Sequence, residues 1–229
     1  LQYAWQTSWG VSTRLIGAVV MVHGDDSGLR FPPAVAPVQV VVVPISLGNW
    51  RETVLPVAKK VEEDLRRSGI RVVLDDREEF TPGWKFAEWE MRGAPLRLEV
   101  GPRDVKDHKA VAVRRDAGLK TPLPLASLTE SVNRLLEEIQ SGLLDQARAF
   151  LKDNTHAVDD YDEFKRLIES RRGFILAPWC GARNCEERVK QETAAGIRVV
   201  PLGPGGEGGG LCLSCGGKSE VRAYFARAY

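Results

Sequence analysis

The sequence predicts an α/β fold, in which a mixed β-sheet covered by helices lies between a short strand–helix segment and a small α+β domain. Residues 38–45 read VQVVVVPI, a continuous β-branched run typical of a strand buried on both faces. Strand-like and helix-like segments alternate after it, which favours a mixed, largely parallel sheet covered on both sides. All four cysteines fall in the last quarter of the chain. We therefore expect three domains, at residues 1–35, 36–152 and 153–229.

The composition is that of an ordinary globular protein, with 43% hydrophobic and 28% charged residues in a chain of 229. Lys and Arg number 32 and Asp and Glu 31, a balance that argues against a bulk electrostatic nucleic-acid clamp but leaves a local basic face open. No apolar stretch approaches the roughly 20 residues that span a bilayer. We find no secretory signal and expect a cytoplasmic protein.

The first block combines a strand and a helix. Residues 3–8 have strand character, Gly10 interrupts it, and residues 12–23 form a helix with an apolar face. The turn at residues 24–28 and the Pro32–Pro33 pair end the block. Because the chain begins inside a strand, we expect the natural polypeptide to include residues before Leu1.

The middle block alternates strands and helices. After the valine-rich strand, apolar residues at helical spacing predict a helix that Gly69 ends. The further predictions are strands at 70–74, 96–100 and 110–113, a helix at 84–91, and a long amphipathic helix carrying Val132, Leu135, Leu136, Ile139, Leu143, Leu144 and Ala147.

The last block carries the cysteines. Residues 160–170 are predicted helical and 173–177 strand-like, and residues 201–210 (PLGPGGEGGG) are a loop by composition. Cys180 and Cys185 form a CX4C pair, and Cys212 and Cys215 form a CX2C pair. Four thiolates complete a tetrahedral zinc shell with no open position, so we expect a structural Zn²⁺ site, with an iron–sulfur cluster as the main rival.

A phosphate-binding pattern lies near the N-terminal end. Arg14 begins a helix just after a glycine-interrupted strand, where its planar guanidinium and the helix N-terminus both favour phosphate oxygens. Taken alone, the pattern is weak and is more typical of an arginine in an ion pair on a helix. His23 is interpreted as a helix end, and Asp25 and Asp26 as a turn in preference to Mg²⁺ ligands.

The string QTSWGVSTRLIGAVVMVHGDDSGLRFPP, residues 6–33, resembles motif 3 of class II aminoacyl-tRNA synthetases, in particular prolyl-tRNA synthetases of the archaeal and eukaryotic-like type. The resemblance implies that residues 1–35 end an antiparallel-sheet catalytic domain. It makes Arg14 the motif 3 arginine, a catalytic residue that binds the ATP phosphates. The implied residues around ATP or prolyl-adenylate are Ser8, Trp9, Gly10, Ser12 and Arg14.

Residues 81–104 and 111–120 resemble the anticodon-binding domain of the same enzymes. Stacking aromatic rings, carboxylates that accept from guanine and cations that hold phosphates are the groups that recognise single-stranded RNA. The candidate RNA contacts are Lys85, Glu88, Trp89, Glu99, Arg103 and Asp104. Trp84 and Trp89 have a core position as an equal alternative, and Arg114 and Arg115 are either a phosphate clamp or a solvated strand end.

The resemblance implies a proline–tRNA ligase that uses ATP and Mg²⁺ to activate L-proline and transfers it to tRNA(Pro). It also implies a homodimer formed through catalytic-domain residues before Leu1, and a zinc-binding domain whose C-terminal tyrosine docks back toward the catalytic domain. The chain alone is expected to be inactive, since most of the proline pocket would lie upstream. The alternative is a non-catalytic, synthetase-like protein that binds RNA or regulates.

Overall fold

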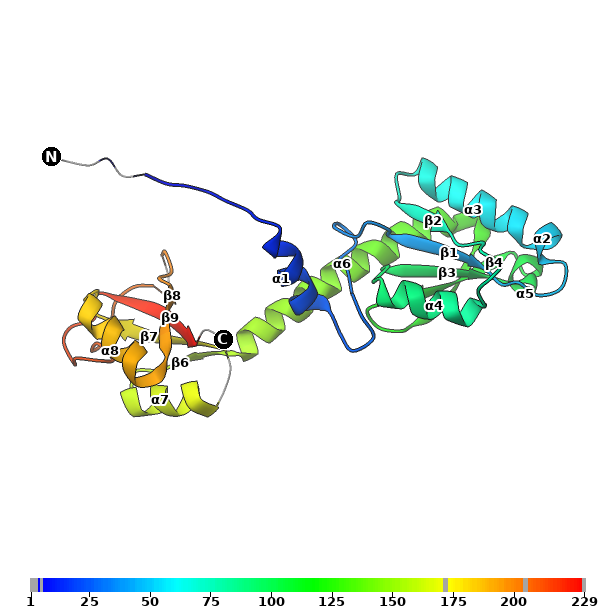
Figure 1. The fold of residues 1–229 in the computed structure, drawn as a ribbon. Helices are drawn as coiled ribbons and strands as arrows, with labels where there is room; N and C mark the ends of the chain where they lie inside the picture. The colour runs from blue at the N-terminus through cyan, green and yellow to red at the C-terminus, as the bar shows by residue number, and fades with distance from the viewer. Residues whose placement is uncertain (1–3, 5, 171–172, 204–205, 228–229) are drawn as a thin grey trace. The chain divides into compact units, whose positions relative to one another are not determined.

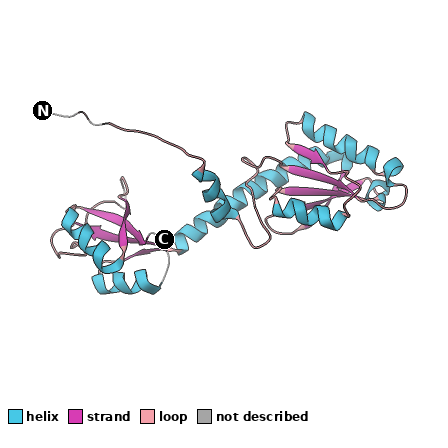
Figure 2. Ribbon diagram, viewed as in Figure 1, coloured by secondary structure: helices cyan, strands magenta, loops and turns pink. Residues whose placement is uncertain are grey.

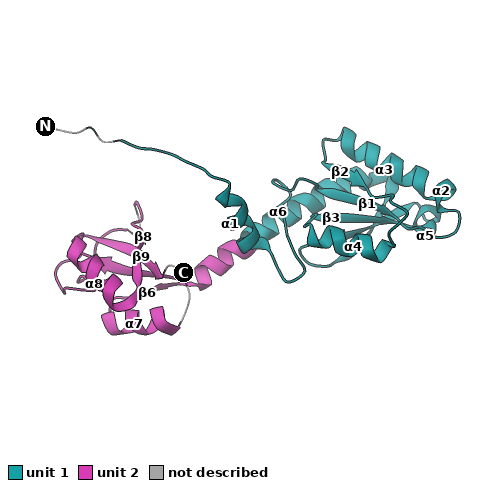
Figure 3. Cartoon of the chain, viewed as in Figure 1, with its two compact units in different colours: residues 1–145 teal, residues 146–229 magenta. Residues whose placement is uncertain are grey.

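The computed structural model describes residues 4, 6–170, 173–203 and 206–227, which form two compact units, residues 1–145 and 146–229 (Figure 3). Within these residues no helix is long and apolar enough to cross a membrane. Figures 1 and 2 show the helices and strands of each unit. The strands of the first unit are β1 Val40–Pro44, β2 Val72–Leu74, β3 Leu96–Val100, β4 Lys109–Arg114 and β5 Lys120–Pro124. Its helices are α1 Arg14–His23, α2 Trp50–Thr53, α3 Leu55–Arg67, α4 Pro82–Met91 and α5 Pro102–Lys106, and α6 Leu128–Asp153 runs on into the second unit.

The five strands of the first unit form one mixed sheet in the order β2-β1-β3-β4-β5. Strand β1 pairs in parallel with both β2 and β3, while β3, β4 and β5 pair antiparallel. The mixed sheet is as predicted, although only half of its pairings are parallel. The carboxyl ends of β1, β2 and β3 meet at one border of the sheet, which we call the carboxyl edge.

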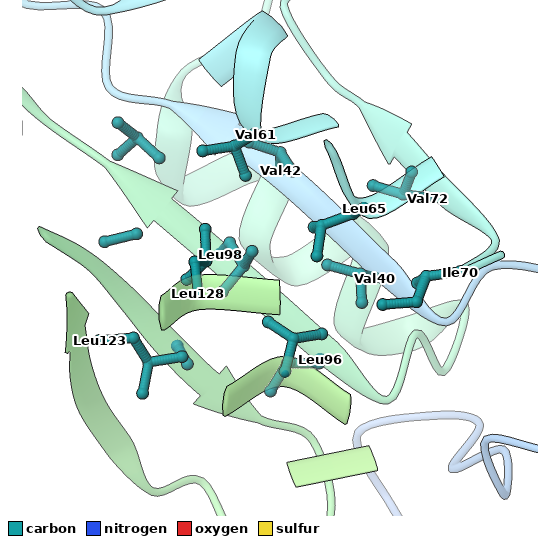
Figure 4. Packing of buried hydrophobic residues seen from close by; sticks show 14 of the residues in the cluster. Val40, Val42, Val61, Leu65, Ile70, Val72, Leu96, Leu98, Leu123 and Leu128 are labelled. Carbon is teal, nitrogen blue, oxygen red and sulfur yellow. The ribbon is translucent and has the colours of Figure 1, made fainter. Parts of the chain in front are cut away.

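The valine run of β1 is buried on both faces, as its composition predicts. Val40 and Val42 contribute to one core, packed with α3 and α6, and Val41 and Val43 to another beside Trp89 of α4. Figure 4 shows the first of these cores, where Leu65 of α3 and Leu128 of α6 lie with Leu96 and Leu98 of β3. Helices therefore cover both faces of the sheet, and the carboxyl edge is the place where functional side chains can gather.

Strand β5 is absent from the sequence-based prediction. It reads KTPLP, and only Leu123 of its five residues is buried. Pro122 and Pro124 lack the N–H groups that a central strand must donate, so the segment has no strand signature. It is tolerated because β5 is the last strand of the sheet and needs partners on one side only.

The strand predicted over residues 3–8 is not borne out in its described part. Ala4, Gln6, Thr7 and Ser8 belong to no strand, and residues 3 and 5 lie outside the described part of the chain. A strand needs a hydrogen-bonding neighbour, and the described residues place none beside it. The helix predicted after it begins at Arg14 and ends at His23.

In the described residues, the second unit consists of a four-stranded sheet of order β6-β7-β9-β8, the end of α6, and helices α7 and α8. Its elements are β6 Thr155–Ala157, α7 Tyr161–Ser170, β7 Phe174–Trp179, α8 Arg183–Thr193, β8 Ala195–Val199 and β9 Val221–Arg227. Phe164 of α7 packs edge-on against Phe225 of β9 in the core, with ring centroids 5.3 Å apart. Strand β9 lies between β7 and β8, so residues 221–227 belong to the sheet interior; Tyr229, for which docking was expected, lies outside the described residues.

Candidate functional site

The structure brings all four cysteines together. Cys180 follows strand β7, Cys185 lies in the first turn of α8, and Cys212 and Cys215 lie in the turn enclosed by the Leu211–Lys218 bridge. Their sulfur atoms all lie within 4.8 Å of one another. The Sγ atom of Cys180 is 3.6 Å from that of Cys185 and 3.9 Å from that of Cys215. The two pairs, far apart in sequence, therefore converge on one point.

These sulfur–sulfur distances fit a metal and not a disulfide. Zinc–sulfur bonds of about 2.3 Å in a tetrahedron place neighbouring sulfurs about 3.8 Å apart. A disulfide would need about 2.05 Å, and all four cysteines are free thiols. The donor set thus suits a cation that prefers four thiolates.

The second cysteine pair lies in a tight backbone turn. The Cys212 N–H donates to the Gly217 carbonyl over 2.6 Å, and the Gly216 N–H donates back to the Cys212 carbonyl over 2.9 Å. Gly216 has φ +70°, a conformation that favours glycine. The Gly217 N–H points at the Cys215 sulfur over 3.4 Å, so the turn orients this side chain.

The thiols influence one another's ionisation. Burial, together with hydrogen bonds to the thiols of Cys180 and Cys215, raises the pKa of Cys185 to about 12. Burial also opposes ionisation of Cys212, but hydrogen bonds donated by the backbone N–H groups of Cys215 and Ser214 outweigh it and lower its pKa to about 7. Four close thiolates repel, so a bound cation is what would allow all of them to ionise together.

At the other end of the chain, Arg14 is the first residue of α1. Its backbone N–H is 3.4 Å from Oγ of Ser12, and Thr13 is the N-cap residue of the helix. Ser8, Trp9, Gly10, Ser12 and Arg14 are all exposed, and Trp9 is 96% exposed. The residues expected around ATP are thus accessible, with the arginine at a helix N-terminus.

Two of the candidate RNA contacts lie inside the first unit. Lys85 is 1% exposed, and its Nζ donates to the Asp75 carbonyl over 3.0 Å. Trp89 is also buried, and its Nε1 donates to Oδ2 of Asp75 over 2.8 Å. Trp89 therefore takes the core position that the sequence left open. Both Lys85 and Trp89 hydrogen-bond Asp75 from the interior of the unit.

A network of charges spreads from Asp75 along the carboxyl edge. The Arg77 guanidinium binds both carboxylate oxygens of Asp75, at 2.9 and 2.8 Å, and also pairs with Glu88. The second oxygen of Glu88 pairs with Arg92 at 2.6 Å. The carboxylate of Glu88, a candidate base contact, is therefore held between two arginines.

The outermost layer of this network is aromatic. The rings of Phe80 and Trp84 stack with centroids 3.8 Å apart and an interplanar angle of 11°. The Arg77 guanidinium lies 4.9 Å from the Phe80 centroid and 5.4 Å from that of Trp84. Trp84 is 43% exposed. We call Arg77, Phe80 and Trp84 the aromatic platform, in which Trp84 is exposed and the other two side chains are partly buried.

Local sequence explains where the platform sits. Thr81 Oγ1 accepts from the Trp84 N–H over 3.3 Å and Pro82 follows it, so α4 starts with an N-cap and a first-turn proline. Asp75 and Arg77 come directly after β2, at the carboxyl edge where open α/β sheets bind ligands. The sequence-based assignment missed Asp75, Arg77 and Phe80, although their place after a parallel strand is a usable signal.

The remaining candidates lie on or after β3. Glu99 pairs with Arg97 at 2.9 Å and with Lys120 at 3.5 Å. Oδ2 of Asp104 accepts from the Gly101 N–H over 3.0 Å at the start of α5. Arg103 is exposed there. Arg103 and Asp104 therefore share the carboxyl edge with the platform, while Glu99 lies within the strand.

Arg114 and Arg115 both belong to ion pairs within the protein. Arg114 binds Asp116 through two nitrogens, at 3.0 and 2.8 Å, and also contacts Glu138. The side chain of Arg115 is 7% exposed and pairs with Asp25. Neither is the solvated strand end that the sequence allowed.

Comparison with known proteins gives a consistent result for both units. The family model described as "Anticodon binding domain" matches residues 39–135, which include the mixed sheet and the platform. The model described as "Prolyl-tRNA synthetase, C-terminal" matches residues 161–229, which include the four cysteines.

Whole-chain relatives agree with these models. Proteins named proline–tRNA ligase are 49% identical in Natranaerobius thermophilus and 45% identical in Alkaliphilus oremlandii over all of this chain. A third, from Cenarchaeum symbiosum, is 48% identical over 99% of it. In each case the chain spans 47% of the relative's length, so it matches about half of these proteins. By its two domain models and the similarity of its whole length to about half of each relative, the chain belongs to the prolyl-tRNA synthetase family.

Proposed function

We propose that this chain is the C-terminal part of an ATP-dependent proline–tRNA ligase. The complete polypeptide would activate L-proline to prolyl-adenylate and transfer the prolyl group to tRNA(Pro). The observation that carries the proposal is the similarity of 43–49% identity, over 98–100% of the chain, to proteins named proline–tRNA ligase. The anticodon-binding model on the first unit supports it independently.

In this proposal Arg14 acts on the ATP phosphates. Attack of the proline carboxylate on the α-phosphate needs no enzymic nucleophile; it needs close positioning and stabilisation of the developing negative charge. An exposed guanidinium at the start of α1 supplies a positive charge that stabilises it, beside the partial positive end of a helix. Ser8, Trp9, Gly10 and Ser12 would line the nucleotide side of the same site. Bound Mg²⁺ would share the neutralisation of the phosphates.

The tRNA(Pro) contacts are proposed at the carboxyl edge of the first unit. Trp84 offers a face on which a base can stack, and Arg77, Arg92 and Arg103 offer donors to bases or phosphates. Lys85 and Trp89 would act indirectly: they hold Asp75 in the interior, and Asp75 orients Arg77. The carboxylates available to accept hydrogen bonds from guanine are Glu88, Glu99 and Asp104. Glu88 would have to release one of its two arginine partners to bind the base.

Cys180, Cys185, Cys212 and Cys215 are proposed to hold one structural Zn²⁺. The metal would connect the end of β7, the start of α8 and the turn before β9, three segments that also contribute Ala177, Val189 and Leu213 to one hydrophobic core. It would neutralise the thiolates and stabilise the second unit, and four thiolates leave no position for a catalytic water.

The same proposal includes domain limits at residues 35 and 152 and a cytoplasmic location. It also includes a homodimer formed by catalytic-domain residues outside this chain. The decisive experiment is ATP–pyrophosphate exchange on the complete polypeptide. Exchange that requires both proline and ATP is expected. A purified polypeptide that binds tRNA(Pro) but shows no proline-dependent exchange would instead be a non-catalytic RNA-binding or regulatory member of the family.

A further inference from the structure

The segment that follows α1 is bound closely to the end of α4. The Leu29 N–H donates to the Met91 carbonyl over 2.9 Å, and the Phe31 N–H to the Gly93 carbonyl over 3.4 Å. Gly28 has φ +124°, and a Cβ atom there would lie 2.6 Å from the Cα atom of Met91. Gly93 has φ +76°, and its Cβ would lie 2.6 Å from Cβ of Leu29. Two glycines thus allow a backbone approach that side chains would block.

A buried arginine holds the turn at the start of this segment. Arg115 binds both oxygens of Asp25, with 2.9 Å between Nη1 and Oδ2. Its third nitrogen, Nε, donates to the Glu90 carbonyl over 3.0 Å, and its side chain is only 7% exposed. Oδ1 of Asp25 also accepts from the Ser27 N–H over 2.9 Å, which orients the carboxylate. Arg115 therefore joins the turn to the last residues of α4.

The contacts of Arg115 with Asp25 and Glu90 connect two elements of the proposed function. Asp25 lies two residues after α1, the helix that Arg14 begins, and Glu90 is next to last in α4, the helix that carries Trp84 and Glu88. A single tRNA must engage the anticodon-binding unit and the adenylate together, and such double engagement depends on the fixed geometry of the two sites. Proline activation by itself uses only the adenylate site.

We propose that Asp25 and Arg115 are positioning residues for tRNA charging, which hold the motif 3 segment in register with the anticodon-recognising helix. The inference rests on the proposed function. The pair is bidentate, so it restricts orientation. The Asp25 side chain is 37% exposed, however, so solvent screens the pair and its loss is expected to change geometry more than stability.

The test measures two reactions of the complete polypeptide. Asp25→Asn keeps an oxygen that can accept from the Ser27 N–H but removes the negative charge. Arg115→Gln removes the guanidinium group that binds both oxygens of Asp25. Each is expected to lower kcat/KM for charging of tRNA(Pro) about tenfold while ATP–pyrophosphate exchange stays within about twofold. The double variant is expected to charge no worse than either single variant, because the two residues act as one unit. Asp26→Asn, on the neighbouring exposed aspartate, is the matched control and should change neither rate.

Charging by Asp25→Asn equal to that by Asp26→Asn would overturn the inference, as would an equal fall in exchange and charging. Absence of proline-dependent exchange in the unaltered polypeptide would remove the proposed function and the inference with it, a different outcome from unchanged charging.

Discussion

The indole Nε1 of Trp89 donates a 2.8 Å hydrogen bond to Oδ2 of Asp75, and both side chains are buried. The same carboxylate binds Arg77, which extends over Phe80 and Trp84 to the surface. An interior aspartate thus determines where the partly buried Arg77, and the ring pair that it contacts, lie.

Trp89→Phe is expected to destabilise the first unit by about 1–3 kcal/mol, because it leaves a buried carboxylate without one donor and opens a small cavity. Urea unfolding of the chain measures the change. Trp84→Phe, at an exposed ring of the same helix, is the control and should cost less than about 0.5 kcal/mol. Equal effects of the two substitutions would contradict the structural role given to Trp89.

The free energy of unfolding should fall at acid pH as the Asp75 carboxylate becomes protonated. Burial opposes its ionisation, but hydrogen bonds from Arg77 and Trp89 and the charge of Lys85 outweigh burial and lower the pKa of Asp75. A folded-state pKa below the unfolded value of about 3.9 gives stability that is present above that pH and lost as the pH falls through the folded pKa. Asp75→Asn should therefore flatten the acid limb of a stability–pH curve; an unchanged limb would mean that other carboxyls dominate it.

Metal analysis should find about one zinc per chain. Cys212→Ser removes one of the four ligands and is expected to increase hydrogen exchange in residues 146–227 while leaving the first unit unchanged. Ser214→Ala, between the two cysteines of the same turn, is the control that keeps all ligands. An iron signal, or a metal-free sample with full protection of the second unit, would refute the zinc assignment.

Arg14→Ala in the complete polypeptide should reduce proline-dependent ATP–pyrophosphate exchange about 100-fold or more, the usual cost of losing one charge-stabilising donor. Its affinity for tRNA(Pro) should stay nearly unchanged. Arg66→Ala, an exposed arginine on α3, is the control for loss of a surface cation. Equal loss of exchange and tRNA affinity would argue against a role at the phosphates.

Trp84→Ala should weaken binding of tRNA(Pro) by about 1–3 kcal/mol if one base stacks on the platform. Filter binding or fluorescence anisotropy at fixed salt measures it. Leu119→Ala, another exposed apolar residue of the first unit, should leave the affinity unchanged. An affinity of Trp84→Ala equal to that of the control would place the bound bases elsewhere.

Much of the first unit could be predicted because its signals are local. The valine run of β1 and the apolar spacing of α3 and α6 each report burial along one element. Helix α8 escaped prediction because it begins inside the first cysteine pair, at Arg183, and is rich in charged residues. Strand β9 is absent from the sequence-based prediction, since nothing in its own residues shows that it lies between β7 and β8.

The sequence by itself determined the alternation of elements and the two cysteine pairs, because each follows from residue types at short spacing. The family came instead from the resemblance of residues 6–33, 81–104 and 111–120 to known synthetases. Only the tertiary structure decided that Cys180 lies 3.9 Å from Cys215 and that Lys85 is buried while Trp84 is exposed. It also decided that Asp25 meets Arg115, 90 residues away. The physical reason is that spacing along one helix or strand determines which side chains share a face. What that face meets depends on how segments distant in sequence pack together.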